Sequence, residues 1–283
     1  MLRNALATLV LVLATVAACD KPAPKAGGAA RIVTLTPSAT ELVAALGAAD
    51  ALVGVDEYST YPPAVAALPK VGSFVAPNFE AIVALRPTLV VADDIHDDAA
   101  AALTGAGVPV VRLPMHALPD VEGALATLGA RLGRTAEAAA RREEMAAAKA
   151  AAGKRRVGRG HTVLIVIDRA PGGLDGMIAA ANGTWLDELV AMTGAGNVLA
   201  GAATRYPKLS AEEIVRTAPD TILDVSYAAD PATAAREWAT RPELASVPAI
   251  VQGRVRVLKA PYFLAPSPRM AAALTELEAA LGP

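Results

Sequence analysis

The chain has 283 residues and a formal net charge of −2, with 26 basic and 28 acidic side chains. No basic surplus is available to hold nucleic acid, so that class of partner is excluded. Hydrophobic residues make up 54% of the chain but aromatic residues only 4%. The apolar mass is therefore mostly aliphatic, as in helices and buried strands, and each aromatic residue is a candidate for a specific role.

Residues 1–19 have the pattern of a lipoprotein signal peptide. Arg3 precedes a stretch of apolar and small residues from Ala5 to Ala18 that is too short to span a bilayer. The sequence "VAAC" resembles a lipobox, and its Cys19 is the only cysteine, so a lipidation site is predicted there. A plain signal peptide with an incidental cysteine is the alternative. Asp20 resembles the proteobacterial signal that keeps a lipoprotein on the inner membrane, which predicts a periplasmic protein anchored there by lipid.

Residues 20–30 are rich in Pro, Ala and Gly and are predicted to form a flexible tether. From Arg31 onward, short apolar runs alternate with helical patterns. Because the runs show no polar alternation, they predict strands covered on both faces of an α/β sheet. The first series comprises "IVTL", "SATELVAALG", "LVGV", "NFEAIVALRP", "LVVAD" and "VPVVRL", and the second comprises "TVLIVI", "GTWLDELVAMTG", "NVLAG", "SAEEIVRTAPD", "TILDV" and "VRVL".

The two series align as an internal repeat. The motif around Glu41 recurs around Glu188, 147 residues later, and the motif around Glu80 recurs around Glu212, 132 residues later. The order of helix, strand, long loop, capped helix and strand is therefore the same twice. This order predicts two related α/β lobes, at residues 31–117 and 157–283, with a ligand cleft between them. Chance similarity between α/β segments is the alternative.

Residues 118–156 lie between the lobes and are rich in helix-forming residues, with Gly153 as the predicted stop. A helix of about 18 residues is roughly 27 Å long, enough to join two lobes rigidly. One long backbone helix is therefore expected. Two lobes tethered outside a membrane describe a solute receptor better than an enzyme.

Several motifs together identify a family resemblance. The segments "RIVTLTPSATELVAALGAADALVGVDEYSTYPP", "LPKVG", "NFEAIVALRPTLVVA", "YPKLSAEEIV" and "SPR" resemble the helical-backbone solute-binding proteins that deliver cobalamin, haem and ferric siderophores to ABC importers. The resemblance runs from Arg31 to the C-terminus, and it includes the cobalamin-binding members in particular. It implies a monomeric receptor with a corrinoid ligand and a permease dimer, with its ATPase subunits, as partner.

The resemblance also implies which residues contact the ligand. Tyr58, Phe74 and Tyr206 match aromatic positions that line the ligand site of the family, and Tyr262 and Phe263 belong to a late loop that contacts ligand. Packing in the core is the alternative for each of the five. Flat apolar faces with few polar groups suit a tetrapyrrole-like solute.

Other ligands of the family remain open. Haem carriers commonly supply an axial tyrosine near the position of Phe74, and a phenyl ring cannot bind iron, although Tyr58 or Tyr206 could substitute. Siderophore carriers gather several basic residues, and here Arg169 and Arg205 are candidates for the cleft. Two are few for a highly anionic ligand. A corrinoid is therefore the predicted ligand, with haem or a ferric siderophore as the alternative.

The stretch "LVVADDIHDD" ends a predicted strand with Asp93 and Asp94 facing the cleft, where they are candidates for contact with ligand amides. A helix cap with a solvent-exposed loop is the alternative for this stretch. Asp97 or Asp98 is expected to cap the next helix. A metal receptor would need several ligands, but His96 has no evident partner. No metal site is predicted.

Two glutamates at equivalent places of the repeat are candidates for docking. Asn78 and Ser210 have the pattern of N-caps, with Ser210 and Glu213 as a capping box, so Glu80 and Glu212 fall in the first turns of two helices. Favourable interaction with the helix dipole explains them by itself. The resemblance adds that one glutamate per lobe contacts arginines of the permease dimer.

An enzyme is the competing class. The sequence contains no G-x-S-x-G, P-loop, G-x-G-x-x-G after a strand, or H-E-x-x-H motif. No catalytic residue or cofactor is therefore predicted.

Overall fold

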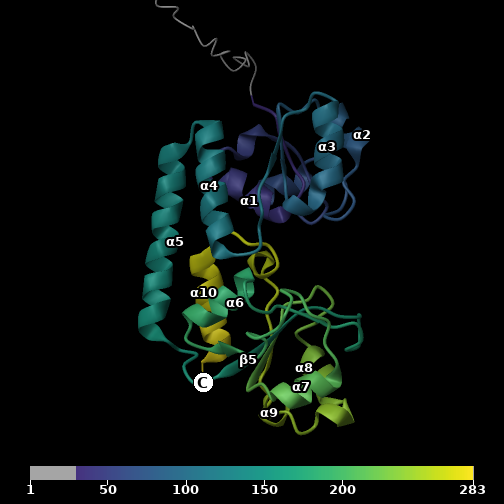
Figure 1. The fold of residues 1–283 in the computed structure, drawn as a ribbon, viewed down its shortest axis with the longest axis vertical. Helices are drawn as coiled ribbons and strands as arrows, with labels where there is room; N and C mark the ends of the chain where they lie inside the picture. Colours follow the sequence, from purple (N-terminus) through teal and green to yellow (C-terminus); the bar gives the residue numbers. More distant parts are fainter. Residues whose placement is uncertain (1–29, 283) are drawn as a thin grey trace, which may run out of the picture.

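The computed structural model describes residues 30–282, which form two α/β lobes (Figure 1). The first lobe contains a four-stranded parallel sheet with the order β2-β1-β3-β4. Its strands are β1 (Ile32–Thr34), β2 (Leu52–Val55), β3 (Leu89–Ala92) and β4 (Val110–Arg112). Its helices are α1 (Pro37–Ala45), α2 (Phe79–Ala84) and α3 (Asp97–Gly105), with 3-10 turns at Ala49–Ala51, Pro63–Ala67 and Asp94–His96. Cys19, which is the predicted lipidation site, and the predicted tether lie outside the described residues, except Ala30.

The second lobe repeats this topology. Strands β7, β5, β8 and β9 are parallel neighbours in the order that β2, β1, β3 and β4 have in the first lobe, and β6 adds an antiparallel edge. The strands are β5 (Thr162–Asp168), β6 (Ile178–Ala179), β7 (Gly196–Asn197), β8 (Thr221–Asp224) and β9 (Val255–Val257). The helices are α6 (Trp185–Met192), α7 (Ala211–Thr217), α8 (Ala234–Ala239), α9 (Pro248–Val251) and α10 (Met270–Leu281), with 3-10 turns at Pro242–Leu244 and Pro261–Phe263. The prediction of two related α/β lobes is confirmed.

The connecting segment contains two helices, α4 (Leu118–Leu132) and α5 (Thr135–Arg155), which lie side by side (Figure 1). They are separated at Gly133, whose φ of 68° is the left-handed conformation that ends a helix. The predicted stop at Gly153 is wrong, because this glycine lies inside α5. A helical glycine costs only about 1 kcal/mol, and the long alanine-rich helix tolerates that cost. The longer helix, α5, runs beside both lobes and is the backbone helix expected between them (Figure 1).

A single apolar core joins the two lobes. It includes residues of both central strands, such as Ile32 in β1 and Val163 in β5, together with Leu125 of α4, Met145 of α5 and Leu274 of α10. Separate clusters pack on the outer faces of the two sheets. Each sheet is therefore covered on both faces, which explains why its strands are continuous apolar runs.

The predicted N-caps are present at two helices. The Asn78 side chain accepts a hydrogen bond from the Ala81 amide at 3.0 Å, and Ser210 forms the expected capping box with Glu213. The predicted cap of α3 is wrong. Neither Asp97 nor Asp98 is its N-cap, because a 3-10 turn precedes α3 and the side chain of Asp93 caps that turn instead.

A buried ion pair also crosses between the lobes. Glu41 of α1 is almost fully buried and accepts a hydrogen bond from the Arg269 side chain at 2.8 Å, while Ser267 donates to the same carboxylate. The Arg269 guanidinium lies over the ring of Tyr61 at 3.8 Å and that of Tyr262 at 4.7 Å. The "SPR" motif therefore fastens the start of α10 to the first lobe.

Candidate ligand-binding cleft

A cavity of about 550 Å³ lies between the lobes, a size in the range of small-molecule sites. Its walls come from segments that follow the strands of both sheets, as expected for open α/β sheets. The first lobe contributes Thr36, Tyr58, Phe74, Val75, Asp93, Ile95, Met115 and His116, among others, and the second contributes Ile167, Asp168, Tyr206, Tyr227, Leu264, Ala265 and Pro266.

Four aromatic side chains dominate the lining. Tyr58 and Phe74 from the first lobe are 47% and 37% exposed, and Tyr206 and Tyr227 from the second are 44% and 65% exposed. Several exposed rings gathered in one cavity form an apolar patch of the kind that meets a ligand or partner. The cavity thus brings together Tyr58, Phe74 and Tyr206, which the sequence had indicated, and adds Tyr227.

The backbone around Tyr58 is held by a buried carboxylate. Asp56, which follows β2, accepts hydrogen bonds from the Tyr58 amide at 3.0 Å and from the Ser59 hydroxyl. Burial raises the pKa of Asp56, and these hydrogen bonds together with Lys70 oppose that rise. The Lys70 ammonium donates to the carbonyl oxygens of Ser59 at 2.8 Å and Asp56 at 3.3 Å. The loop that presents Tyr58 is therefore fixed by polar contacts on both sides of the tyrosine.

Two aspartates and a histidine form a polar edge of the cleft. Asp93 is buried and Asp94 is exposed, and His116 Nε2 lies 3.1 Å from Asp94 Oδ2. Burial, together with the neighbouring Asp94, raises the pKa of Asp93 to about 7. The hydrogen bond with Asp93 lowers the pKa of Asp94, and His116 and Arg205 lower it further. Asp93 therefore keeps its proton to a higher pH than Asp94 does.

This polar edge can interact with a ligand in two ways. Asp93, Asp94 and His116 each offer a ligand atom, and these atoms lie within 4.8 Å of one another, which is close enough to share a cation. They can also exchange hydrogen bonds with amide groups, because a protonated carboxyl donates and an ionised one accepts. Two side chains of the second lobe interact electrostatically with this edge, the polar Tyr206 and the charged Arg205.

His96 is a structural residue of the first lobe. Its ring is buried, with Nδ1 accepting from the Asp93 amide at 3.0 Å and Nε2 2.7 Å from the Phe74 carbonyl oxygen. His96 therefore has two hydrogen-bond partners, and it is not part of the group of Asp93, Asp94 and His116 whose ligand atoms lie close together. The ring also packs edge-on against Phe74, so it supports an aromatic side chain of the cleft wall.

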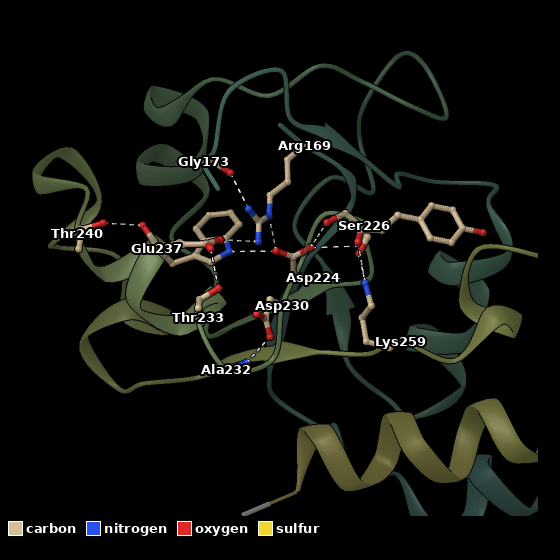
Figure 2. Close-up of polar contacts among 12 residues, drawn as sticks. Arg169, Gly173, Asp224, Ser226, Asp230, Ala232, Thr233, Glu237, Thr240 and Lys259 are labelled. Carbon is tan, nitrogen blue, oxygen red and sulfur yellow. Dashed lines mark hydrogen bonds and ion pairs between the residues drawn. The ribbon is translucent and has the colours of Figure 1, made fainter. Parts of the chain in front are cut away.

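Arg169 was a candidate for the cleft, and the structure places it in the interior of the second lobe instead (Figure 2). Its side chain is 0% exposed and pairs with Asp224 at 2.7 Å and Glu237 at 2.9 Å. It also donates to the Gly173 carbonyl oxygen at 2.6 Å. The sequence could not show this, because the partners are 55 and 68 residues away along the chain. Arg205 is exposed and helps to lower the pKa of Asp94, but it does not line the cavity.

The positions of Tyr262 and Phe263 also differ from expectation. Phe263 is buried in the core shared by the lobes, so the alternative of packing is correct for it. The Tyr262 hydroxyl donates to Glu276 at 2.6 Å, and burial and this carboxylate raise the pKa of Tyr262 to about 12. Neither residue lines the cavity described above. The same loop reaches it through Leu264, Ala265 and Pro266, because the 3-10 turn at Pro261–Phe263 directs the two rings inward.

Comparison with known proteins agrees with this geometry. A family model described as periplasmic binding protein matches residues 32–262. The chain belongs to this family. Members of this family are substrate-binding proteins that take up a small-molecule ligand in the periplasm.

Two curated relatives are named as binding proteins for vitamin B12 or cobalamin. The chain is 28% identical over 253 residues to the vitamin B12-binding protein of Vibrio parahaemolyticus, covering 87% of each chain. It is 31% identical over 254 residues to the cobalamin-binding protein of Halobacterium salinarum, covering 85% of this chain and 66% of the relative.

One similar solved structure is of a protein named for a different ligand, haem. The apo form of the periplasmic haem-binding protein RhuT from Roseiflexus sp. RS-1 is 29% identical and superposes with a TM-score of 0.79, covering 90% of this chain and 98% of that chain. The family and the fold are therefore shown, and the similar proteins include carriers named for two different ligands.

The two glutamates considered for permease docking lie on the surface of this family member. Glu80 in α2 and Glu212 in α7 are both exposed, and neither has an ion-pair partner among residues 30–282. An exposed valine follows each after three residues, at Val83 and Val215. Each lobe thus presents the same small pattern of one carboxylate beside one apolar side chain, one turn apart on a helix.

Sequence reasoning missed two residues that the structure makes prominent. Tyr227 lies in "LDVSYAAD", directly after strand β8, and its place at a strand end in an aromatic-poor chain was the signal that could have found it. Glu41 was used only to align the repeat. A glutamate inside the apolar pattern "ATELVAAL" is the kind of charge that needs a buried partner, and Arg269 provides it.

Proposed function

We propose that this protein is the substrate-binding lipoprotein of an ABC importer, which captures a cobalamin-like corrinoid in the cleft and delivers it to the inner-membrane permease. The observation that carries the proposal is the combination of exposed aromatic rings from both lobes with an acidic cleft edge. Aromatic and aliphatic walls suit the flat face of a macrocycle, and the few polar groups at the edge orient it.

The charge of the cleft favours a corrinoid over haem. A corrinoid carries neutral amide side chains, whereas haem carries two carboxylates. Asp94 and Asp168 are exposed acids of the cleft region, and Asp93 and His116 complete its polar edge. Two like charges 4 Å apart repel by about 4 kcal/mol near a protein surface. An amide that donates to a carboxylate instead gains about 1.5–3 kcal/mol.

The basic residues do not reverse this preference. Arg169 is neutralised inside the lobe by Asp224 and Glu237, so it is not available to an anionic ligand. Arg205 helps to lower the pKa of Asp94, and it does not line the cavity. A ferric siderophore with several negative charges is disfavoured for the same reason.

Haem is the second candidate, and the similarity to the Roseiflexus haem-binding protein is the observation that favours it. An iron ligand would have to come from Tyr58, Tyr206, Tyr227 or His116, since Phe74 has no atom that binds a metal. His116 is held by Asp94, an arrangement that also orients a metal-bound imidazole.

Calorimetry with cyanocobalamin, cobinamide, haemin and a ferric siderophore tests the proposal. We expect one-to-one binding of the corrinoids, weakened roughly two- to tenfold by Phe74→Ala or Tyr206→Ala, because each substitution removes one ring contact. Phe79→Ala is the matched control, since Phe79 is 42% exposed on α2 and does not line the cavity. Tight binding of haemin with no binding of either corrinoid would overturn the choice of ligand.

The remaining parts of the proposal concern attachment and docking. Cys19 carries the lipid, residues 20–30 tether the folded part, and the two lobes, at residues 31–117 and 157–283, close on the ligand around the connecting segment at 118–156. Glu80 and Glu212 contact arginines on the permease dimer, one from each lobe. Their exposure and their equivalent surroundings support this role. No helix within residues 30–282 combines the length and apolar character needed to cross a bilayer.

A further inference from the structure

Two tyrosines from opposite lobes meet across the cleft. The ring centroids of Tyr58 and Tyr227 are 5.8 Å apart, with a tilt of 31° between the ring planes. Both rings line the cavity, and about half or more of each side chain is exposed. This separation is within the range of favourable aromatic pairs. The two rings therefore form one wall of the cleft that neither lobe could make alone.

The loop that carries Tyr227 is fixed by a buried carboxylate and a lysine. Asp224, at the end of β8, accepts hydrogen bonds from the Ser226 hydroxyl at 2.6 Å and the Ser226 amide at 3.2 Å. The Lys259 ammonium donates to the carbonyl oxygens of Ser226 at 2.9 Å and Tyr227 at 3.0 Å. Figure 2 shows Asp224, Ser226 and Lys259 in this arrangement, with Arg169 on the far side of Asp224.

The same device fixes Tyr58 in the first lobe. In that loop, Asp56 corresponds to Asp224 and Ser59 corresponds to Ser226. Lys70 corresponds to Lys259. In both loops a buried aspartate binds the serine next to the tyrosine, and an exposed lysine binds backbone carbonyls on that segment.

This similarity is not a consequence of the internal repeat. Asp56 follows β2, whose counterpart in the second lobe is β7, whereas Asp224 belongs to β8, the counterpart of β3. The two sets of contacts therefore occur at different places in the topology. Both, however, hold a tyrosine at the same point of the cleft, one from each lobe.

We propose that Tyr58 and Tyr227 contact the ligand together, as an aromatic pair that we call the jaw. Lys259 is a positioning residue that holds Tyr227 in this pair, as Lys70 holds Tyr58. This inference rests on the proposed function and deepens it, since it names a ligand contact in the second lobe and the residues that set its position. A fixed backbone lowers the entropy lost when an exposed ring stops moving against a ligand.

The chemistry of the jaw fits a ligand with a conjugated face and hydrogen-bond acceptors at its rim. Burial, with the neighbouring Asp56, raises the pKa of Tyr227, so its hydroxyl stays protonated at neutral pH and can donate. Amide carbonyl groups around a macrocycle are acceptors of this kind. The ammonium groups of both lysines are used on backbone carbonyls rather than offered to an anionic ligand.

A double-mutant cycle separates positioning from general structural support. The variants Tyr227→Leu, Lys259→Met and their combination are compared in calorimetric titrations with cyanocobalamin, and with haemin in parallel. We expect each single variant to bind about two- to tenfold more weakly. The double variant should bind no more weakly than Tyr227→Leu, because the lysine acts through that tyrosine. Lys259→Arg should restore most of the affinity, since a guanidinium also donates to two carbonyls, and Lys154→Met on the exposed end of α5 is the control.

Nuclear magnetic resonance of the protein with ring-labelled tyrosine provides a readout without ligand, and the chain has five tyrosines. The Tyr58 ring signals should shift in Tyr227→Leu and in Lys259→Met, and should stay in place in Lys154→Met. Unchanged Tyr58 signals, or an additive loss of affinity in the double variant, would overturn the positioning role of Lys259.

Full affinity in Tyr227→Leu, while wild-type protein binds its ligand, would refute the jaw and leave the proposed function standing. If wild-type protein bound neither cyanocobalamin nor haemin, the proposed function and the jaw would both be refuted.

Discussion

Replacing Arg169 with methionine tests whether this residue is structural. The substitution removes a fully buried cation that contacts two carboxylates of the second lobe. The Asp224 side chain is fully buried and that of Glu237 is 18% exposed, so neither can recover its hydration where it lies. Asp224 would keep Ser226 and Trp238 as hydrogen-bond donors but no counter-charge.

The expected loss can be estimated from this burial. Breaking a buried ion pair by removing one partner costs about 3–5 kcal/mol, because an uncompensated charge stays in the interior. Whole domains are stable by only about 5–15 kcal/mol, so the variant should fold but melt early. At roughly 2–4 °C per kcal/mol for chains somewhat shorter than this one, the melting temperature should fall by roughly 6 to 20 °C.

Urea denaturation and thermal melts of Arg169→Met measure this loss, with Arg241→Met as the matched control. Arg241 also has two acidic neighbours, but at 3.8 and 3.9 Å and with 34% of its side chain exposed, so its removal should cost about 0–1 kcal/mol. A loss of stability in Arg169→Met no larger than in the control, together with a tenfold or greater loss of ligand affinity, would refute the structural role and return Arg169 to the cleft.

Three further predictions follow from the polar edge, the N-terminus and the two glutamates. Because the pKa of Asp93 rises from 3.8 to about 7 on folding, its carboxyl stabilises the folded state below about pH 4 and this stability is lost as pH rises toward 7. Asp93→Asn should therefore flatten the fall in stability between these pH values by on the order of 1 kcal/mol or more, and an unchanged profile by urea titration would contradict the assignment. Cys19→Ser should yield an unlipidated, unprocessed precursor on gels, and normal processing would remove the basis for the lipid anchor. Glu80→Lys with Glu212→Lys should abolish uptake of labelled cyanocobalamin and stimulation of the importer ATPase while ligand affinity in solution stays unchanged, and wild-type uptake would refute docking. Alanine at either position, if it only removed a helix-dipole interaction, would cost about 0.3–1 kcal/mol of stability and leave uptake intact.

Local patterns were sufficient for the parts of the structure that depend on neighbouring residues. The apolar runs predicted the buried strands, and the side chains of Asn78 and Ser210 predicted two helix starts, because capping involves residues only three positions apart. The repeat predicted two lobes, since equal order of elements along a chain produces equal topology. Tyr58, Phe74 and Tyr206 were expected at the ligand site because they match aromatic positions of the family that the sequence resembles, and all three line the cavity.

The backbone conformation of a loop, and hence the direction of its side chains, could not be predicted from the sequence. Tyr262 and Phe263 were expected at the cleft with the rest of their loop, but the 3-10 turn there points them into the interior and brings Leu264 to the cavity. The split of the connecting segment into α4 and α5 depended in the same way on one conformation, the left-handed backbone of Gly133.

The order and periodicity of residues were enough to predict the fold class and the repeat, and the resemblance of several motifs was enough to predict the family. The surroundings of individual charged and aromatic residues, in contrast, depend on contacts made in the folded chain. Arg169 meets Asp224 and Glu237, Glu41 meets Arg269, and Tyr227 meets Tyr58, and each contact joins segments more than 50 residues apart. The environment of a side chain, and hence whether its charge is neutralised in the core or offered to a ligand, is set by partners that come together only when the chain is folded.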